Sequence, residues 1–296
     1  MTARPVGPVR ARVGESACWS ARDQRLYSVD IWSNRLWRHD VATGAATCAV
    51  FDEMASAVVV ADTGVVVALE SHLLHGTIDG ADWRRIDAPA DHPAEHRFND
   101  ACVDPQGRLI ISTMRNSRFG AAREGRLLRL DAGGWTCLAE GFWTLNGLAF
   151  SPDGGTLYWS DSHPSVQTVW HCDYDGRTLA GASLFARFDD LAGRPDGAAV
   201  DADGGYWSAG VGGGELYRFA PDGRLDRTIA LPIENPTRPA FGGPGLDRLF
   251  VTSMGERLTR PDPDGLAGAV LTLDIGIEGA AMAVMAVPES TIAARG

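Results

Sequence analysis

Six polar residues stand at the same point of a repeated sequence pattern, each four residues before the last apolar residue of a short run. They are separated by 41, 43, 47, 50 and 41 residues: Glu15, Ser56, Asn99, Asn146, Asp196 and Thr237. Carboxylate and amide oxygens such as those of Glu15, Asn146 and Asp196 suit a hard or borderline divalent cation. Two carboxylates in one site repel each other, so a cation between them or a proton on one of them is expected. The pattern predicts a polar site with these chemistries, provided that the fold brings the six positions together.

The elements around these positions are short strands joined by tight turns. Asn146–Phe150 leads through the turn Ser151–Gly155 into a second apolar run at Thr156–Ser160. Asp-Gly between two apolar runs is a strong β-hairpin signal. Four short strands repeating every 40 to 50 residues or so are typical of β-propeller blades. We therefore predict an all-β fold, one six-bladed β-propeller domain over residues 1–296, with the six positions forming a ring at one mouth of its channel.

The chain ends need a place in this architecture. Val9–Val13 alternates apolar and polar residues, which predicts a strand. It precedes the first inner strand, so we expect it to form the outer edge of the last blade and close the ring. The rest of that blade is expected from Phe241 to Met285. Hairpin geometry also places the loops after the second strands, including Met114–Arg123, on the same face as the ring.

Composition narrows the range of partners and compartments. The chain carries a formal net charge of −11 and a pI of about 5.0, which disfavours nucleic acid and anionic membranes as partners. No apolar run approaches the ~20 residues that span a membrane, and residues 1–13 lack the apolar segment of a secretory signal. The five cysteines contain no CxxC pair, so no disulfide framework is predicted. We expect a cytoplasmic protein.

Four short motifs together resemble the senescence marker protein/gluconolactonase/luciferin-regenerating (regucalcin-like) family of sugar lactonases. They span nearly the whole chain: Gly14-Glu15-Ser16, Arg97-Phe98-Asn99-Asp100, Asn146-Gly147-Leu148 and Pro195-Asp196-Gly197. The resemblance implies a six-bladed propeller that hydrolyses a small-molecule sugar lactone with one divalent metal ion. The identity of that ion stays open among Ca²⁺, Mg²⁺, Mn²⁺, Zn²⁺ and Fe²⁺.

The resemblance also implies roles for five residues. Glu15, Asn146 and Asp196 match the metal ligands of the family, and Arg97 and Asn99 match its substrate-binding pair. Asp196 also matches the residue assigned as general base. The chemistry is consistent with these residue types, because a carboxylate can take a proton from the attacking water. The arginine fork and the amide can hold the oxygens of a polyol.

Two other functions are compatible with the same scaffold. One is an esterase or phosphotriesterase with a more apolar pocket, and the other is a non-enzymatic propeller that binds calcium and regulates a partner. The polar pair Arg97 and Asn99 beside the ligand residues favours the sugar lactonase over the first. The presence of both ligand carboxylates, Glu15 and Asp196, favours it over the second.

One loop predicts a feature of the substrate. Met114–Arg123 carries three arginines in an acidic protein and is expected on the ring face. Guanidinium groups pair with carboxylates and sulfonates through two parallel hydrogen bonds. We therefore expect Arg115 or Arg118 to contact an anionic substituent of the lactone.

Overall fold

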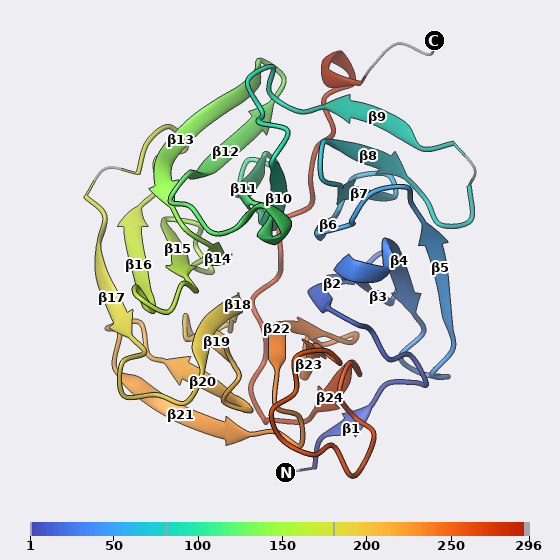
Figure 1. Ribbon diagram of the computed structural model, residues 1–296, viewed down its shortest axis with the longest axis vertical. Coiled ribbons are helices and arrows are strands. Elements are labelled where there is room, and N and C mark those ends of the chain that lie inside the picture. The colour runs from blue at the N-terminus through green and yellow to red at the C-terminus, as the bar shows by residue number, and fades with distance from the viewer. Residues whose placement is uncertain (1, 81, 180, 293–296) are drawn as a thin grey trace.

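The six predicted blades are present. A computed structural model describes residues 2–80, 82–179 and 181–292 of the chain. Within these residues the backbone forms six four-stranded antiparallel sheets arranged in a ring (Figure 1). The helical elements in this part of the chain are three 3₁₀ turns: η1 (Ile31–Ser33), η2 (Ser117–Phe119) and η3 (Glu289–Thr291). No helix in the same residues is long and apolar enough to cross a bilayer.

The blades follow one another along the chain, with the inner strand first. Blades one to three consist of β2 (Gly14–Ser20), β3 (Arg25–Asp30), β4 (Arg35–His39), β5 (Ala46–Val50); β6 (Ala57–Val60), β7 (Val65–Ala68), β8 (His72–Gly76), β9 (Arg84–Asp87); and β10 (His96–Val103), β11 (Leu109–Arg115), β12 (Gly125–Asp131), β13 (Gly134–Phe142). Blades four to six consist of β14 (Leu145–Phe150), β15 (Thr156–Asp161), β16 (Thr168–Asp173), β17 (Ser183–Arg187); β18 (Arg194–Val200), β19 (Tyr206–Val211), β20 (Glu215–Phe219), β21 (Leu225–Ala230); and β22 (Pro236–Gly242), β23 (Arg248–Ser253), β24 (Leu271–Leu273), β1 (Arg4–Pro5).

Strand register confirms that the ring positions are equivalent. In all six blades the residue four places after the ring residue pairs with the start of the second strand: Trp19 with Leu26, Val60 with Val65, Val103 with Leu109, Phe150 with Leu157, Val200 with Tyr206 and Phe241 with Leu249. In every blade except the second the register also shifts next to the ring residue. Such bulges re-aim side chains and are frequent beside active sites.

Apolar side chains between neighbouring blades hold the ring together. Trp207 of β19 is fully buried and packs edge-on against Phe241 of β22, with ring centroids 6.2 Å apart. Its indole Nε1 donates a hydrogen bond of 2.7 Å to Asp201, which lies in the turn after β18. Large aromatic side chains bury the most apolar area per residue, and such contacts fix the angle between blades.

An N-terminal strand closes the last blade, as predicted, but it is not the predicted segment. Arg4 and Pro5 form β1 and pair with Thr272 and Leu271 of β24. Val13 makes only an isolated bridge to Met254, and the amide of Ala11 donates to Gly268. The alternation in Val9–Val13 therefore reflects a segment packed against the loop after β23, with Ala11 and Val13 buried.

The C-terminal segment leaves the last blade and crosses the face opposite the ring. The blade ends at Leu273, so the expectation that it extends to Met285 is wrong. Gly279 bridges Asp201 after β18, and Met285 bridges Ala61 after β6. Figure 1 shows this red trace crossing the centre of the propeller. Its partners lie in hairpin turns far from the ring residues, so the segment covers the other mouth of the channel.

Candidate active site

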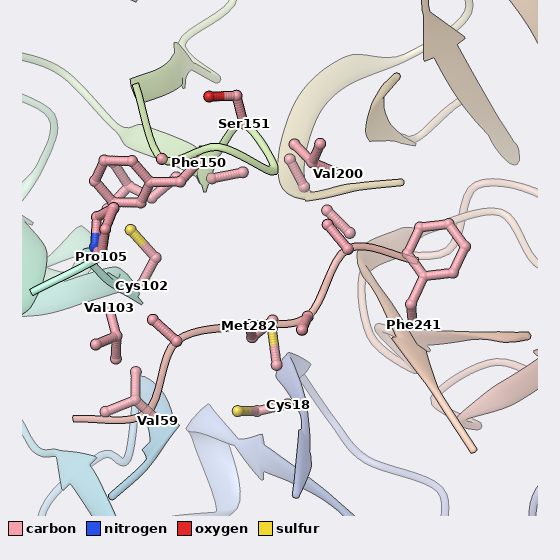
Figure 2. Close-up of a pocket in the computed structure, with 18 of the residues that line it drawn as sticks. Cys18, Val59, Cys102, Val103, Pro105, Phe150, Ser151, Val200, Phe241 and Met282 are labelled. Carbon is pink, nitrogen blue, oxygen red and sulfur yellow. The ribbon is translucent and has the colours of Figure 1, made fainter. Parts of the chain in front are cut away.

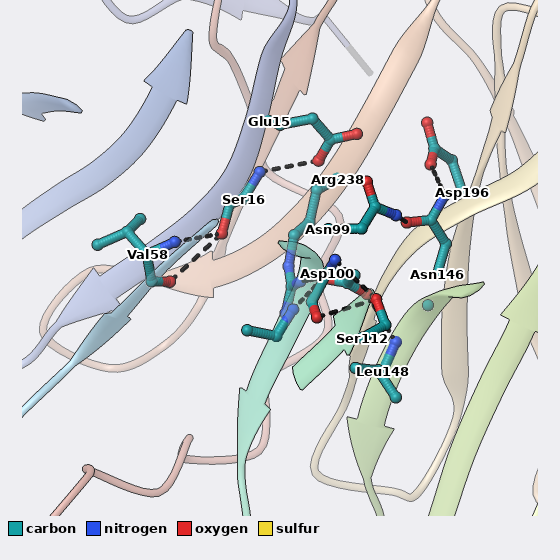
Figure 3. A network of polar contacts seen from close by, with 12 residues as sticks. Glu15, Ser16, Val58, Asn99, Asp100, Ser112, Asn146, Leu148, Asp196 and Arg238 are labelled. Carbon is teal, nitrogen blue, oxygen red and sulfur yellow. Dashed lines mark hydrogen bonds and ion pairs between the residues drawn. The ribbon is translucent and has the colours of Figure 1, made fainter. Parts of the chain in front are cut away.

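Four side chains from three blades form one hydrogen-bonded series at the ring. Arg97 donates to Asn99 Oδ1 at 2.8 Å, and Asn99 Nδ2 donates to Asn146 Oδ1 at 2.6 Å. Asn146 Nδ2 in turn donates to Asp196 Oδ1 at 2.7 Å (Figure 3). The guanidinium has no acceptor atoms, so it fixes the direction of every donor in the series. The structure thus brings together four of the residues predicted from the sequence.

Glu15 and Asp196 are two carboxyl groups that disfavour each other's charged form. Burial, followed by the charge of Asp100, raises the pKa of Glu15 to about 7, although the amide of Ser16 donates to it at 2.8 Å. Burial also raises the pKa of Asp196 well above its usual value, and the charge of Glu15 adds to this effect. The ring therefore holds two carboxyl groups whose charged forms are unfavourable unless a cation or a proton is supplied.

The two hydroxyl positions of the ring have structural roles. Ser56 Oγ donates to the carbonyl of Ala68 at 3.2 Å, and Thr237 Oγ1 donates to the carbonyl of Gly14 at 2.6 Å. Both hydroxyls thus bind backbone of their own or the next blade. The chemistry of the ring is left to its carboxylate and amide members.

Ser162 is a site residue that the sequence did not reveal. It follows β15, and its hydroxyl accepts from Asn146 Nδ2 at 2.7 Å and donates to the carbonyl of Pro195. It thereby fixes the Asn146 amide from a second side and links blades four and five. A sequence signal does exist, because Ser162 directly follows the last residue of a second strand on the ring face.

A buried ion pair forms the floor of the site. Arg238 Nη1 donates to Asp100 Oδ1, and both side chains are at most 7% exposed. Asp100 Oδ2 also accepts the amide of Leu148 at 2.9 Å (Figure 3). In the sequence Asp100 stands out only as the last residue of the motif Arg97-Phe98-Asn99-Asp100. The structure shows that it joins blade three to blades four and six.

Beyond this floor the channel changes character. A cavity of about 390 Å³ lies between the inner strands and the C-terminal segment, lined mainly by apolar side chains such as Phe150, Phe241 and Met282 (Figure 2). Cys18 and Cys102 also face it. Burial raises the pKa of both thiols, which makes them poor nucleophiles. The polar chemistry is therefore confined to the ring side of the channel.

Two of the three arginines of the Met114–Arg123 loop are paired with carboxylates, and the third, Arg123, donates to the carbonyl of Gly141. Arg115 Nη1 donates to Glu124 at 3.0 Å, and Arg118 lies 2.8 Å from Glu70 Oε1. Glu124 Oε2 is also hydrogen-bonded to His96 Nε2, at 3.2 Å. The cationic patch expected from the sequence is thus largely neutralised by acids from neighbouring segments.

The donor set at the ring fits a divalent ion. Glu15 and Asp196 supply two carboxylates whose repulsion a bound cation would offset, and Asn146 supplies an amide. In its present hydrogen bonds Asn146 points Nδ2 at Asp196, so its oxygen becomes a ligand only after the amide turns over. No group of three or more His, Cys, Asp or Glu suited to a metal is found among residues 2–80, 82–179 and 181–292. A site here would therefore depend on the amide as its third donor.

The fold and the ring define a class: six-bladed propellers with a carboxylate and amide site at one mouth of the channel. A family model described as the SMP-30/Gluconolactonase/LRE-like region matches residues 13–255, and the chain belongs to this family. 6-Deoxy-6-sulfogluconolactonase of Pseudomonas putida is 37% identical over 278 residues, covering 91% of this chain and 93% of that protein. Pentonolactonase XacC of Haloferax volcanii is 35% identical over 271 residues, covering 90% of this chain and 89% of that protein.

A solved structure agrees with this assignment. The calcium-binding protein regucalcin from Agrobacterium tumefaciens is 26% identical, with a TM-score of 0.87. The match covers 97% of this chain and 98% of that one. The similarity therefore includes all six blades.

Proposed function

We propose that this chain is a metal-dependent lactonase that opens a sugar lactone to the sugar acid. Membership of the family and two relatives named as lactonases support this reaction. The observation that carries the proposal is the series from Arg97 to Asp196 beside Glu15, because it combines substrate-binding donors with paired carboxyl groups.

The reaction needs an activated water and a route for its proton. A divalent ion held by Glu15, Asn146 and Asp196 would supply Lewis-acid polarisation of the lactone carbonyl. Asp196 accepts a proton from the attacking water, the role of a general base. As the ester C–O bond breaks, the same proton passes to the departing ring oxygen. The product is the hydroxy acid, and Asp196 returns to its starting state.

Arg97 and Asn99 offer different hydrogen-bonding groups to the sugar. The Asn99 amide already donates to Leu145 and Asn146 and accepts from Arg97, so its remaining capacity is to accept one hydrogen bond from a substrate hydroxyl. Arg97 Nη1 binds Asn99 and the carbonyl of Phe98, and the other guanidinium N–H groups remain to donate to sugar oxygens. Arg115 or Arg118 would reach a substrate anion only by leaving its carboxylate partner.

The test is hydrolysis by metal-stripped protein supplied with each divalent ion and each of a panel of aldonolactones. We expect turnover only with metal. In Asp196→Asn the acceptor for Asn146 is kept and the charge is lost, so kcat/KM should fall by about 10³-fold or more. Metal affinity should also fall, while the thermal unfolding midpoint without metal should not decrease. Asp189→Asn, an exposed acid before β18, is the matched control.

Other outcomes distinguish the competing functions. Near-normal turnover by Asp196→Asn with metal bound would exclude the proposed role of this residue. Aryl esters and phosphotriesters belong in the panel, because preference for them would indicate an esterase on the same scaffold. Metal binding without turnover of any substrate would indicate a non-enzymatic propeller that binds calcium, as the calcium-binding protein regucalcin from Agrobacterium tumefaciens does.

A further inference from the structure

A second set of equivalent positions lies two residues before each ring residue, near the start of the inner strand. In blades one and two these side chains pack in an apolar core, and in blades three and five they are arginines on β10 and β18. The members of this set in blades one to six are Val13, Met54, Arg97, Thr144, Arg194 and Asn235. Blades three and five therefore present arginines on either side of the blade that carries Asn146.

The two arginines occupy matching places in their sheets. Arg97 pairs with Met114 and is followed by the register shift of blade three, and Arg194 pairs with Val211 and is followed by the shift of blade five. Arg97 demonstrates the geometry, because its guanidinium reaches the side chain of Asn99 two residues on. By the same geometry Arg194 lies beside Asp196, whose pKa its charge lowers.

Arg194 interacts with Asp196 through its charge alone, whereas Arg97 is also held by hydrogen bonds. The half-buried guanidinium of Arg194 makes no hydrogen bond or ion pair with any residue in the part of the chain that the structure describes. Two arginines of the blade-three loop are paired: Arg115 with Glu124 and Arg118 with Glu70. A planar fork of five donors left open beside a reaction site is suited to a carboxylate-like anion.

We propose that Arg194 binds an anionic substituent of the lactone and makes the enzyme prefer charged sugar lactones over neutral ones. The inference rests on the proposed function and names the substrate class of that site. Two residues of strand separate Arg194 from Asp196 by about 6.6 Å along the backbone. An anion bound by Arg194 therefore lies close to the carboxyl group proposed as general base. A sulfonate, a carboxylate and a phosphate share this recognition chemistry.

The experiment compares kcat/KM for glucono-1,5-lactone with that for its 6-deoxy-6-sulfo, 6-carboxylate and 6-phospho counterparts. We expect wild type to prefer at least one charged lactone, and the panel identifies which anion it is. Arg194→Gln should lose about 10- to 100-fold on that substrate and less than threefold on the neutral one. Arg194→Lys keeps the charge without the fork and should fall between the two. Arg115→Gln and Arg118→Gln, made at paired arginines, should change the ratio less than threefold.

Four outcomes would contradict the proposed role of Arg194 in binding an anion. Equal loss on both substrates in Arg194→Gln would mean that Arg194 acts only through Asp196, and would overturn the inference. So would no loss, a wild-type preference for the neutral lactone, or selective loss in Arg115→Gln or Arg118→Gln. Turnover with an unchanged ratio refutes this inference alone. Absence of turnover on every lactone by metal-loaded wild type refutes the proposed function as well.

Discussion

Removing the guanidinium of Arg238 should destabilise the protein strongly, because it would leave Asp100 buried without a counter-charge. The two side chains are 7% and 6% exposed and form an ion pair beneath the ring. Asp100 would retain the amides of Leu148 and Ala101 as donors. It would then add an uncompensated charge near Glu15, whose pKa the Asp100 charge already raises and the Arg238 charge lowers.

The size of the effect follows from the burial of the pair. Breaking a buried ion pair by removing one partner typically costs about 3–5 kcal/mol, whereas replacing both partners with uncharged groups is often close to neutral. Arg238→Met keeps much of the apolar volume, so most of the loss should come from the unpaired carboxylate. For a chain of this length that loss corresponds to a fall of roughly 5–8 °C in Tm. The double variant Asp100→Asn/Arg238→Met should recover most of it.

Urea unfolding followed by tryptophan fluorescence measures this loss. Metal-free buffer is required, since any ion that binds the native state alone would add its own stabilisation. Arg187→Met is the matched control, because its pair with Asp189 is exposed at 61% and 58% and lies 3.8 Å apart; it should change the free energy of unfolding by less than about 0.5 kcal/mol. The reasoning is refuted if Arg238→Met stays within about 1 kcal/mol of wild type. It is also refuted if the double variant is no more stable than the single one.

Two further predictions concern pH and the closure of the ring. Burial lowers the pKa of His39 to about 4, so the native state favours the neutral ring. Protonation of His39 therefore favours the unfolded state. The free energy of unfolding keeps its full value above about pH 6.5 and falls by about 1.4 kcal/mol per pH unit as the pH drops from there toward 4. His39→Gln, which can keep the bond to Ser28 Oγ, should flatten this dependence in urea unfolding between pH 7 and 5; an unchanged slope would contradict it. Deleting residues 1–6 removes β1 and exposes the edge of β24, so Tm should fall and association should appear in size-exclusion chromatography. An unchanged Tm and elution volume would refute that role.

The sequence contained enough to predict the ring, because the ring depends on local chemistry. The turns Asp153-Gly154 and Asp203-Gly204 fix where the first hairpins of blades four and five reverse, and both glycines adopt positive φ, near 72° and 82°. Counting back four residues from the last apolar residue before the turn then reaches the ring position in every repeat. Asn99 consequently lies within hydrogen-bonding distance of Asn146, and Asn146 within hydrogen-bonding distance of Asp196.

The outer closure was harder to predict, because it depends on contacts distant in the chain. β1 is only two residues long and contains Pro5, so it shows no period of its own. Pro5 is tolerated because an edge strand needs few amide donors. The clearer alternation at Val9–Val13 was the stronger signal, but that segment packs against a loop and pairs with β23 only through the bridge next to its end.

Pairing of surface charges was likewise beyond the sequence. The arginine loop indicated a cationic patch, yet Glu70 reaches Arg118 from the preceding blade across 48 residues of chain. No local pattern reports such a contact. The equivalence of Arg97 and Arg194, by contrast, could have been found by applying the repeat alignment two residues before each ring position.

Charge balance connects the separate parts of the site. Three carboxylates and three guanidinium groups share the ring side of the channel: Glu15, Asp100, Asp196, Arg97, Arg194 and Arg238. Arg238 is paired with Asp100 and also acts on Glu15, together with Arg97, whereas Arg194 is the arginine whose charge acts on Asp196. An anionic substrate that engages Arg194 withdraws this offsetting charge from Asp196, so a cation at the carboxylates becomes more favourable. Binding free energies are reciprocal; metal and charged lactone should therefore each strengthen the binding of the other, and a neutral lactone should show less of this coupling.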